Sequence, residues 1–349
     1  MIALSTIDKY MNEFSLYPLL KSVSRSFYLT LRVLPSNMRQ PISIAYLLAR
    51  SADSVTDNNI FSTDEKIDYL NQLKSALINI VNQPDAERYS NQLNHLAEKR
   101  LVSSQNEIIR LYSTLSNSDK KAIKKVIDTL LEGMAQDIRY FSDESSALQY
   151  KATPIKALAD DKSLDEYTYL VAGCVGEFWT ALSISHIPAL KHWSEGEMSK
   201  RGIEFGKALQ LTNIVRDVAK DYALGRCYLP ITDLQSHHLT IEMMDDKHNN
   251  SKFEPIYNKW IARAETYYES SEIYFLSIPK KCYRLRLAVL WPILIGLATL
   301  NKIKRKKNLL DRDNEIKVTR TWVYKMLLIS LLGVFSNSFI QHWIKRLKK

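Results

Sequence analysis

Apolar and polar positions follow a helical spacing along most of this chain. Residues 58–130 are typical of helices with polar outer surfaces, and further helices are predicted over 42–57, 164–182, 210–221, 262–275 and 288–300. Glycine and proline, which interrupt helices, number only nine and ten in 349 residues. Because so few breaks separate the helices, the sequence predicts one all-α, single-domain fold.

The last of these predicted helices, residues 288–300, has thirteen residues without a charge. That length falls short of the roughly 20 residues needed to span a bilayer. Pro292 within the run predicts a kink. We therefore expect a buried helix.

Residues 306–349 are predicted to form a basic and apolar tail after a catalytic region of residues 1–305. A mostly apolar run covers 326–344, which is marginal for a transmembrane helix. The aromatic residues at its two ends resemble interfacial anchors: Trp322, Tyr324 and Trp343. We expect a tail that contacts the membrane surface. A transmembrane anchor and an amphipathic helix docked on the protein are the alternatives that stay open.

The net charge of +10 comes from the C-terminal fifth. From Lys280 to Lys349 there are 17 Lys and Arg against 3 Asp and Glu, which leaves 31 basic and 35 acidic residues before Lys280. A basic region attracts either nucleic acid or an anionic membrane. The flanking apolar runs favour the membrane, and no nucleic-acid partner is expected.

The three cysteines are few, odd in number and scattered, which is typical of a reducing compartment. The first residues lack a basic segment followed by an apolar run, so no secretory signal is expected. We predict a cytoplasmic protein at the cytoplasmic face of the membrane.

Pairs of aspartates four residues apart occur twice. Asp217 and Asp221 are predicted to share one helix face, with Asn213 one turn earlier. Asp53 and Asp57 repeat the spacing. Such oxygen ligands suit Mg²⁺, which often shares the phosphates of a substrate. A solvated acidic surface is the alternative for either pair alone, but the second copy favours two facing helices that clamp a diphosphate through bridging metal ions.

The helix of the first pair carries Tyr46, Arg50, Asp53 and Asp57 in a single stripe. Charges on a largely apolar helix are costly unless they are paired or bind a metal ion. The sequence therefore predicts that this stripe is functional. Three arginines near the aspartates are expected to help bind that diphosphate: Arg50, Arg216 and Arg226.

Four segments resemble the squalene and phytoene synthases, the head-to-head prenyl transferases. They are SRSFYL at Ser24–Leu29, AYLLARSADSVTD at Ala45–Asp57, YTYLVAGCVGEFW at Tyr167–Trp179 and QLTNIVRDVAKDYALGRCYLP at Gln210–Pro230. The resemblance covers roughly residues 15–305 and implies an isoprenoid-synthase-type helical bundle around a central apolar cavity. The amino-acid sequences of these segments are most similar to those of bacterial squalene synthases.

The resemblance also implies roles for particular residues. Catalysis is expected from Tyr46, Tyr167, Arg50 and Arg216. Metal ions are expected at Asp53, Asp57, Asn213, Asp217 and Asp221. Substrate binding is expected at Ser24, Arg25, Phe27, Ala172, Gly176, Gln210 and Arg226, and Lys317 is expected near the cofactor.

Glycines within the predicted helix 164–182 need a reason, because each costs up to about 1 kcal/mol relative to alanine. Gly173 and Gly176 permit either close packing of another helix or room for an isoprenoid tail, and both explanations can hold.

By resemblance, two farnesyl diphosphates condense to presqualene diphosphate, which NADPH reduces to squalene for sterol or hopanoid biosynthesis. Mg²⁺ and NADPH are the implied cofactors, although the chain has no G-x-G-x-x-G segment to indicate nicotinamide binding. Two alternatives stay open: a non-reductive synthase that makes phytoene or dehydrosqualene, and an inactive relative that acts as a scaffold. We expect a monomer.

Overall fold

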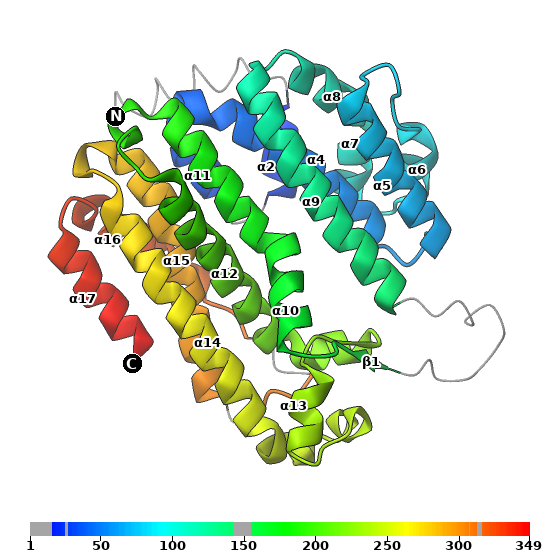
Figure 1. Ribbon diagram of the computed structural model, residues 1–349, viewed down its shortest axis with the longest axis vertical. Helices are drawn as coiled ribbons and strands as arrows, with labels where there is room; N and C mark the ends of the chain where they lie inside the picture. The colour runs from blue at the N-terminus through cyan, green and yellow to red at the C-terminus, as the bar shows by residue number, and fades with distance from the viewer. Residues whose placement is uncertain (1–15, 25–26, 142–154, 307, 313–315) are drawn as a thin grey trace. The chain divides into compact units, whose positions relative to one another are not determined.

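The computed structural model describes residues 16–24, 27–141, 155–306, 308–312 and 316–349, and these residues are mostly helical (Figure 1). The all-α prediction is confirmed. The described residues add only one short parallel pair of strands, β1 (Lys156–Ala157) and β2 (Arg226–Cys227). The described residues divide into two compact units, one within residues 1–138 and 181–188 and the other within residues 139–180 and 189–349.

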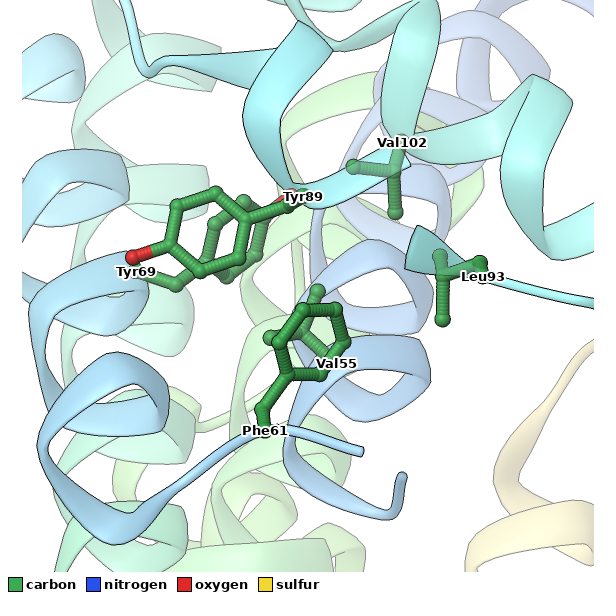
Figure 2. Packing of buried hydrophobic residues seen from close by; sticks show 6 residues of the cluster. All are labelled: Val55, Phe61, Tyr69, Tyr89, Leu93 and Val102. Atoms are coloured by element: carbon green, nitrogen blue, oxygen red, sulfur yellow. The ribbon is translucent and has the colours of Figure 1, made fainter. Parts of the chain in front are cut away.

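Eight helices lie wholly or mainly in the described part of the first unit. They are α2 (Tyr17–Val23), α3 (Phe27–Val33), α4 (Ser36–Thr56), α5 (Thr63–Ile78), α6 (Ala86–Gln92), α7 (Leu96–Ser103), α8 (Gln105–Ser113) and α9 (Asn117–Phe141). A buried cluster from α4, α6, α7 and their neighbours anchors this unit (Figure 2): Val55, Phe61, Tyr69, Tyr89, Leu93 and Val102. The rings of Tyr69 and Tyr89 lie 4.8 Å apart, so aromatic contact fixes α5 against α6.

Helix α4 begins earlier than predicted, at Ser36 instead of Ile42. Pro41 lies inside the helix and is buried. A proline inside a helix removes one backbone hydrogen bond. Burial of Met38 and Pro41 compensates for that loss, and the predicted start of the helix at residue 42 was wrong.

The second unit contains α10 (Asp161–Thr168), the π-helical segment η1 (Tyr169–Gly173), α11 (Cys174–His186), α12 (Glu195–Ala223), α13 (Ile231–Ser236), α14 (Asn250–Ser277), α15 (Tyr283–Arg305), α16 (Arg320–Gly333) and α17 (Asn337–Lys348). The end of α11 belongs to the first unit. The predicted helix 164–182 thus consists of two α-helical segments joined by a π turn. Residues 231–252 contain α13, short 3₁₀ turns and the start of α14.

Helix α12 packs against η1 and α11 with almost no side chain between the backbones. A Cβ atom built on Gly206 would lie 2.2 Å from the carbonyl oxygen of Ala172, and one on Gly176 would lie 1.8 Å from that of Gly202. Both distances are far inside van der Waals contact. The close helix approach predicted from the glycines is confirmed, whereas room for an isoprenoid tail stays a prediction.

The uncharged run 288–300 lies inside α15 and is largely buried, as expected. Within the described residues, the segment 280–305 is the one helix long and apolar enough to cross a membrane, and 78% of its most apolar window is buried in the protein. This burial identifies α15 as a core helix. The central apolar cavity stays a prediction.

The C-terminal run 326–344 does not form one helix. It is divided between α16, with 14 residues, and α17, with 12. Each is shorter than the roughly 20 residues of a membrane-spanning helix. The predicted boundary after residue 305 coincides with the end of α15 and stays a prediction as a domain boundary.

The α12 contact predicts the effect of adding one methyl group. Gly206→Ala should lower the free energy of unfolding by about 1–3 kcal/mol because the new Cβ overpacks the contact with Ala172. Gly196→Ala is the matched control, because it lies in the same helix and its Cβ would meet no atom within 4 Å. That control should be neutral or stabilising by up to about 1 kcal/mol. Urea unfolding measures both, and equal effects would contradict the packing argument.

Candidate active site

The polar stripe of α4 lies on a half-buried face of the first unit. Arg50 forms an ion pair with Asp53 and donates a second hydrogen bond to Glu98 Oε1 on α7, at 3.0 Å. Asp57 caps the C-terminal end of the helix and is exposed. The predicted stripe is therefore present on one helix, and Glu98 joins it although no sequence pattern indicated that residue.

Charge repulsion is built into this face. Burial and the negative charge of Asp57 raise the pKa of Asp53 to about 6, with Arg50 offsetting part of the increase. The carboxylate of Glu98 adds to the repulsion. A divalent cation beside Asp53 and Asp57 would relieve it, so the donor set fits Mg²⁺.

Aromatic contacts hold the first turns of the α4 stripe. The rings of Phe27 and Tyr46 lie 5.1 Å apart, and the Tyr46 hydroxyl donates to the carbonyl of Val23 at 3.1 Å. Ser24 is buried and its hydroxyl donates to the carbonyl of Leu20. The ring of Phe27 therefore lies against the α4 stripe at Tyr46, whereas the Ser24 hydrogen bond is local to α2 and Arg25 lies outside the described residues.

Helix α12 carries the second acidic face. Its half-buried positions include Gln210, Asn213, Asp217 and Asp221, while the residues between them, such as Ile214 and Val218, are buried. This periodicity puts the four polar side chains along one side of the helix. The predicted grouping is thus present within the second unit.

Arg216 holds Asp217 in a two-pronged contact, with Nε donating to Oδ1 at 2.9 Å and Nη2 to Oδ2 at 2.5 Å. Helix α12 ends at Ala223, and Gly225 turns the chain with a φ of +81°, a conformation that favours glycine. Arg226 then pairs in β2 with Lys156 of β1. The short sheet therefore fixes the backbone of Arg226. This arginine follows the acidic face of α12 closely in the sequence.

Tyr167 stacks on Tyr228, with ring centroids 4.8 Å apart and planes 21° apart. The π segment η1 follows directly and contains Ala172. Within it, the Tyr169 hydroxyl donates to Glu177 at 3.2 Å, and burial with the Glu177 charge raises the pKa of Tyr169 to about 12. Tyr169 is therefore a neutral donor at physiological pH. Single π turns are frequent at functional sites.

No group of three or more His, Cys, Asp or Glu side chains arranged to hold a metal ion occurs in the described part of the chain. Each acidic face offers a pair of carboxylates. Mg²⁺ commonly binds one or two carboxylates and completes its octahedron with water and substrate phosphates. Pairs of carboxylates are the donor set that such a substrate-shared metal requires.

Lys317 is exposed, and its carbonyl accepts from Lys302 Nζ at 2.6 Å. The described strands are two residues long, so they do not form the βαβ unit of a dinucleotide-binding fold. A role for Lys317 toward NADPH stays a prediction.

Residues 20–322 match the squalene/phytoene synthase family, and the chain belongs to this family. Similar curated proteins are bifunctional lycopene cyclase/phytoene synthases. The one of Neurospora crassa is 27% identical over 64% of this chain and 37% of its own length, and the one of Gibberella fujikuroi is 30% identical over 70% and 40%. The aligned region is thus less than half of each relative.

Solved structures show the same fold. TcSQS with a bound ligand superposes with a TM-score of 0.72 at 20% identity, covering 98% of both chains. A dehydrosqualene synthase gives 0.63 at 23% identity over 95% of this chain and 99% of its own. Squalene synthase HpnC from Alicyclobacillus acidocaldarius gives 0.58 at 16% identity, over 85% and 97%.

Removal of the charge repulsion on α4 should stabilise the protein by an amount that depends on pH. Because the folded-state pKa of Asp53 is raised, its neutral form contributes stability at low pH that is lost as the pH rises through about 6. Asp57→Asn removes the opposing charge and an unfavourable anion at a helix C-terminus, so it should stabilise the metal-free protein by about 0.3–1 kcal/mol above that pH. The gain should shrink near pH 4.

Thermal unfolding in the presence of a chelator, with wild type and Asp57→Asn compared at both pH values, measures this difference. Equal stability of the two proteins above the pKa of Asp53 would contradict the repulsion argument.

Proposed function

We propose that the chain catalyses the Mg²⁺-dependent head-to-head condensation of two prenyl diphosphates. The observation that carries this proposal is the pair of acidic helix faces, on α4 and α12, each with an arginine bound directly to an aspartate. Their occurrence in a member of the squalene/phytoene synthase family supports an active enzyme. An inactive scaffold would have no need to retain such repulsive faces.

The difficult step is the departure of diphosphate, which leaves an allylic carbocation and a highly charged leaving group. Mg²⁺ would supply Lewis-acid neutralisation of that charge. The residues proposed to hold it are Asp53, Asp57, Asn213, Asp217 and Asp221. Arg50, Arg216 and Arg226 are proposed to bind diphosphate oxygens by charge-assisted hydrogen bonds, which strengthen as negative charge develops.

The carbocation must meet a second prenyl chain before it meets water. Half-buried apolar residues of η1, including Leu170, Val171 and Ala172, are suited to contact an isoprenoid. Tyr46 and Tyr167 are proposed to stabilise the cation through their ring faces, and each ring is held by an aromatic neighbour. Phe27 and Gly176 are also proposed to contact the prenyl chains.

We propose farnesyl diphosphate as the substrate, presqualene diphosphate as the first product and squalene as the second. The last step requires a hydride, which NADPH would supply. Non-reductive formation of phytoene is the second candidate, because the similar curated proteins carry the name phytoene synthase. A cytoplasmic, membrane-peripheral location and a monomeric state also stay proposals.

Incubation of the purified protein with Mg²⁺ and labelled farnesyl or geranylgeranyl diphosphate, with and without NADPH, tests the substrate and product. We expect squalene from farnesyl diphosphate only when NADPH is present. Phytoene from geranylgeranyl diphosphate without NADPH would instead support the second candidate. Absence of any condensed product from either substrate would contradict both.

Substitution on either acidic face should remove the activity. Asp53→Asn and Asp217→Asn should each lower kcat/KM by at least about a hundredfold, because each removes charge that holds metal at the leaving group. Glu197→Gln is the matched control: it changes an exposed carboxylate of α12 that pairs with Arg201 at 2.9 Å. That control should retain activity. Full activity of either aspartate variant would contradict the assignment of its face.

A further inference from the structure

Both C-terminal helices, α16 and α17, dock on the body of the second unit. Figure 1 shows α17 beside α14 and α15, and α16 also packs on α15. The inner side of α16 is buried through Met326, Ser330 and Gly333. The indole of Trp291 on α15 donates to the Ser330 hydroxyl at 2.8 Å. These contacts fix one side of α16 against the core.

A buried arginine of α15 holds the turn between α16 and α17. Arg286 of α15 is fully buried, and its guanidinium donates to the carbonyls of Val334 at 2.9 Å and Ile278 at 2.6 Å and to Asn337 Oδ1 at 2.6 Å. Val334 and Ile278 are the C-terminal caps of α16 and α14, where helix dipoles concentrate negative charge. The ring of Phe275 covers the cation at 4.2 Å. The turn between α16 and α17 is therefore held to the body of the protein.

The outer side of α16 is also apolar. Leu332, Leu328 and Tyr324 are 86%, 67% and 63% exposed. Three further exposed apolar residues complete this surface, which we call the α16 outer face: Ile329, Leu331 and Phe335. A surface helix normally turns polar residues outward, and an exposed apolar patch of this kind marks an interaction site.

The segment that carries the α16 outer face is positively charged. Residues 316–349 contain seven Lys and Arg and no Asp or Glu. Arg320 and Lys325 are exposed on α16, and Lys345 and Arg346 are exposed on α17. Apolar side chains bordered by cations match the hydrocarbon boundary and anionic headgroups of a membrane. A second copy of the same surface would bring like charges together.

We propose that the α16 outer face inserts into the interface of an anionic lipid bilayer, with α16 lying along the membrane and not crossing it. The helices are 14 and 12 residues long, and Arg286 holds their turn inside the protein, so neither is free to span. The membrane contact belongs to a rigid part of the folded protein. This inference does not depend on the proposed catalytic activity.

Sedimentation with phosphatidylcholine vesicles, with and without phosphatidylglycerol, tests the proposal on the full chain. We expect binding to the anionic vesicles that weakens in high salt. The double substitution of Leu328→Glu and Leu332→Glu should weaken it at least about tenfold, because it places two charges in the apolar interface. Val81→Glu is the matched control, since Val81 is also 86% exposed but lies between α5 and α6 of the first unit.

Retention of vesicle binding by the double variant would overturn the proposal, as would absence of binding by the wild-type chain. Light scattering after gel filtration separates the membrane from a second copy: a wild-type dimer that the double variant dissociates, without vesicle binding, would also overturn it. Circular dichroism melting confirms that each variant is folded. Resistance of the membrane-bound protein to alkaline carbonate extraction would contradict a helix that lies in the interface.

Discussion

Repulsion between carboxylates on rigid helices is the constraint on which the proposed site depends. A helix fixes Asp53 and Asp57 on neighbouring turns, where their charges oppose each other and raise the pKa of Asp53. Arg50 offsets only part of that repulsion, because it also binds Glu98. Because part of the negative charge on this face is not neutralised, the face favours a divalent cation. A cation held there by few protein ligands remains open to phosphate oxygens.

In the second unit, close packing between helix backbones holds the acidic face of α12 in place. Small residues let α12 touch η1 and α11 directly, so the acidic face of α12 and the π segment belong to one rigid assembly. Rigid helices hold charged groups in place without reorganisation, which is what makes electrostatic stabilisation effective in catalysis. The same helix thereby joins the charge proposed to act on diphosphate to the apolar residues that would contact a prenyl chain.

The all-α class, the two acidic faces and the buried run in α15 were predictable from the sequence because each follows a helical period. The contribution of Glu98 to the α4 face was not predictable, because only the fold brings α7 to Arg50. The π turn at η1 has no periodic signature. The division of the C-terminal tail into two helices could have been predicted from Ser336. Its hydroxyl accepts a hydrogen bond from the amide of Phe339 and caps α17, as serine commonly does.

The most direct test is a crystal structure of the protein with Mg²⁺ and an unreactive thiodiphosphate analogue of farnesyl diphosphate. Our account predicts one diphosphate held through metal ions to Asp53 and Asp57 on one side and to Asp217 and Asp221 on the other. It would be contradicted by a diphosphate bound to a single acidic face, or by metal ions bound away from both.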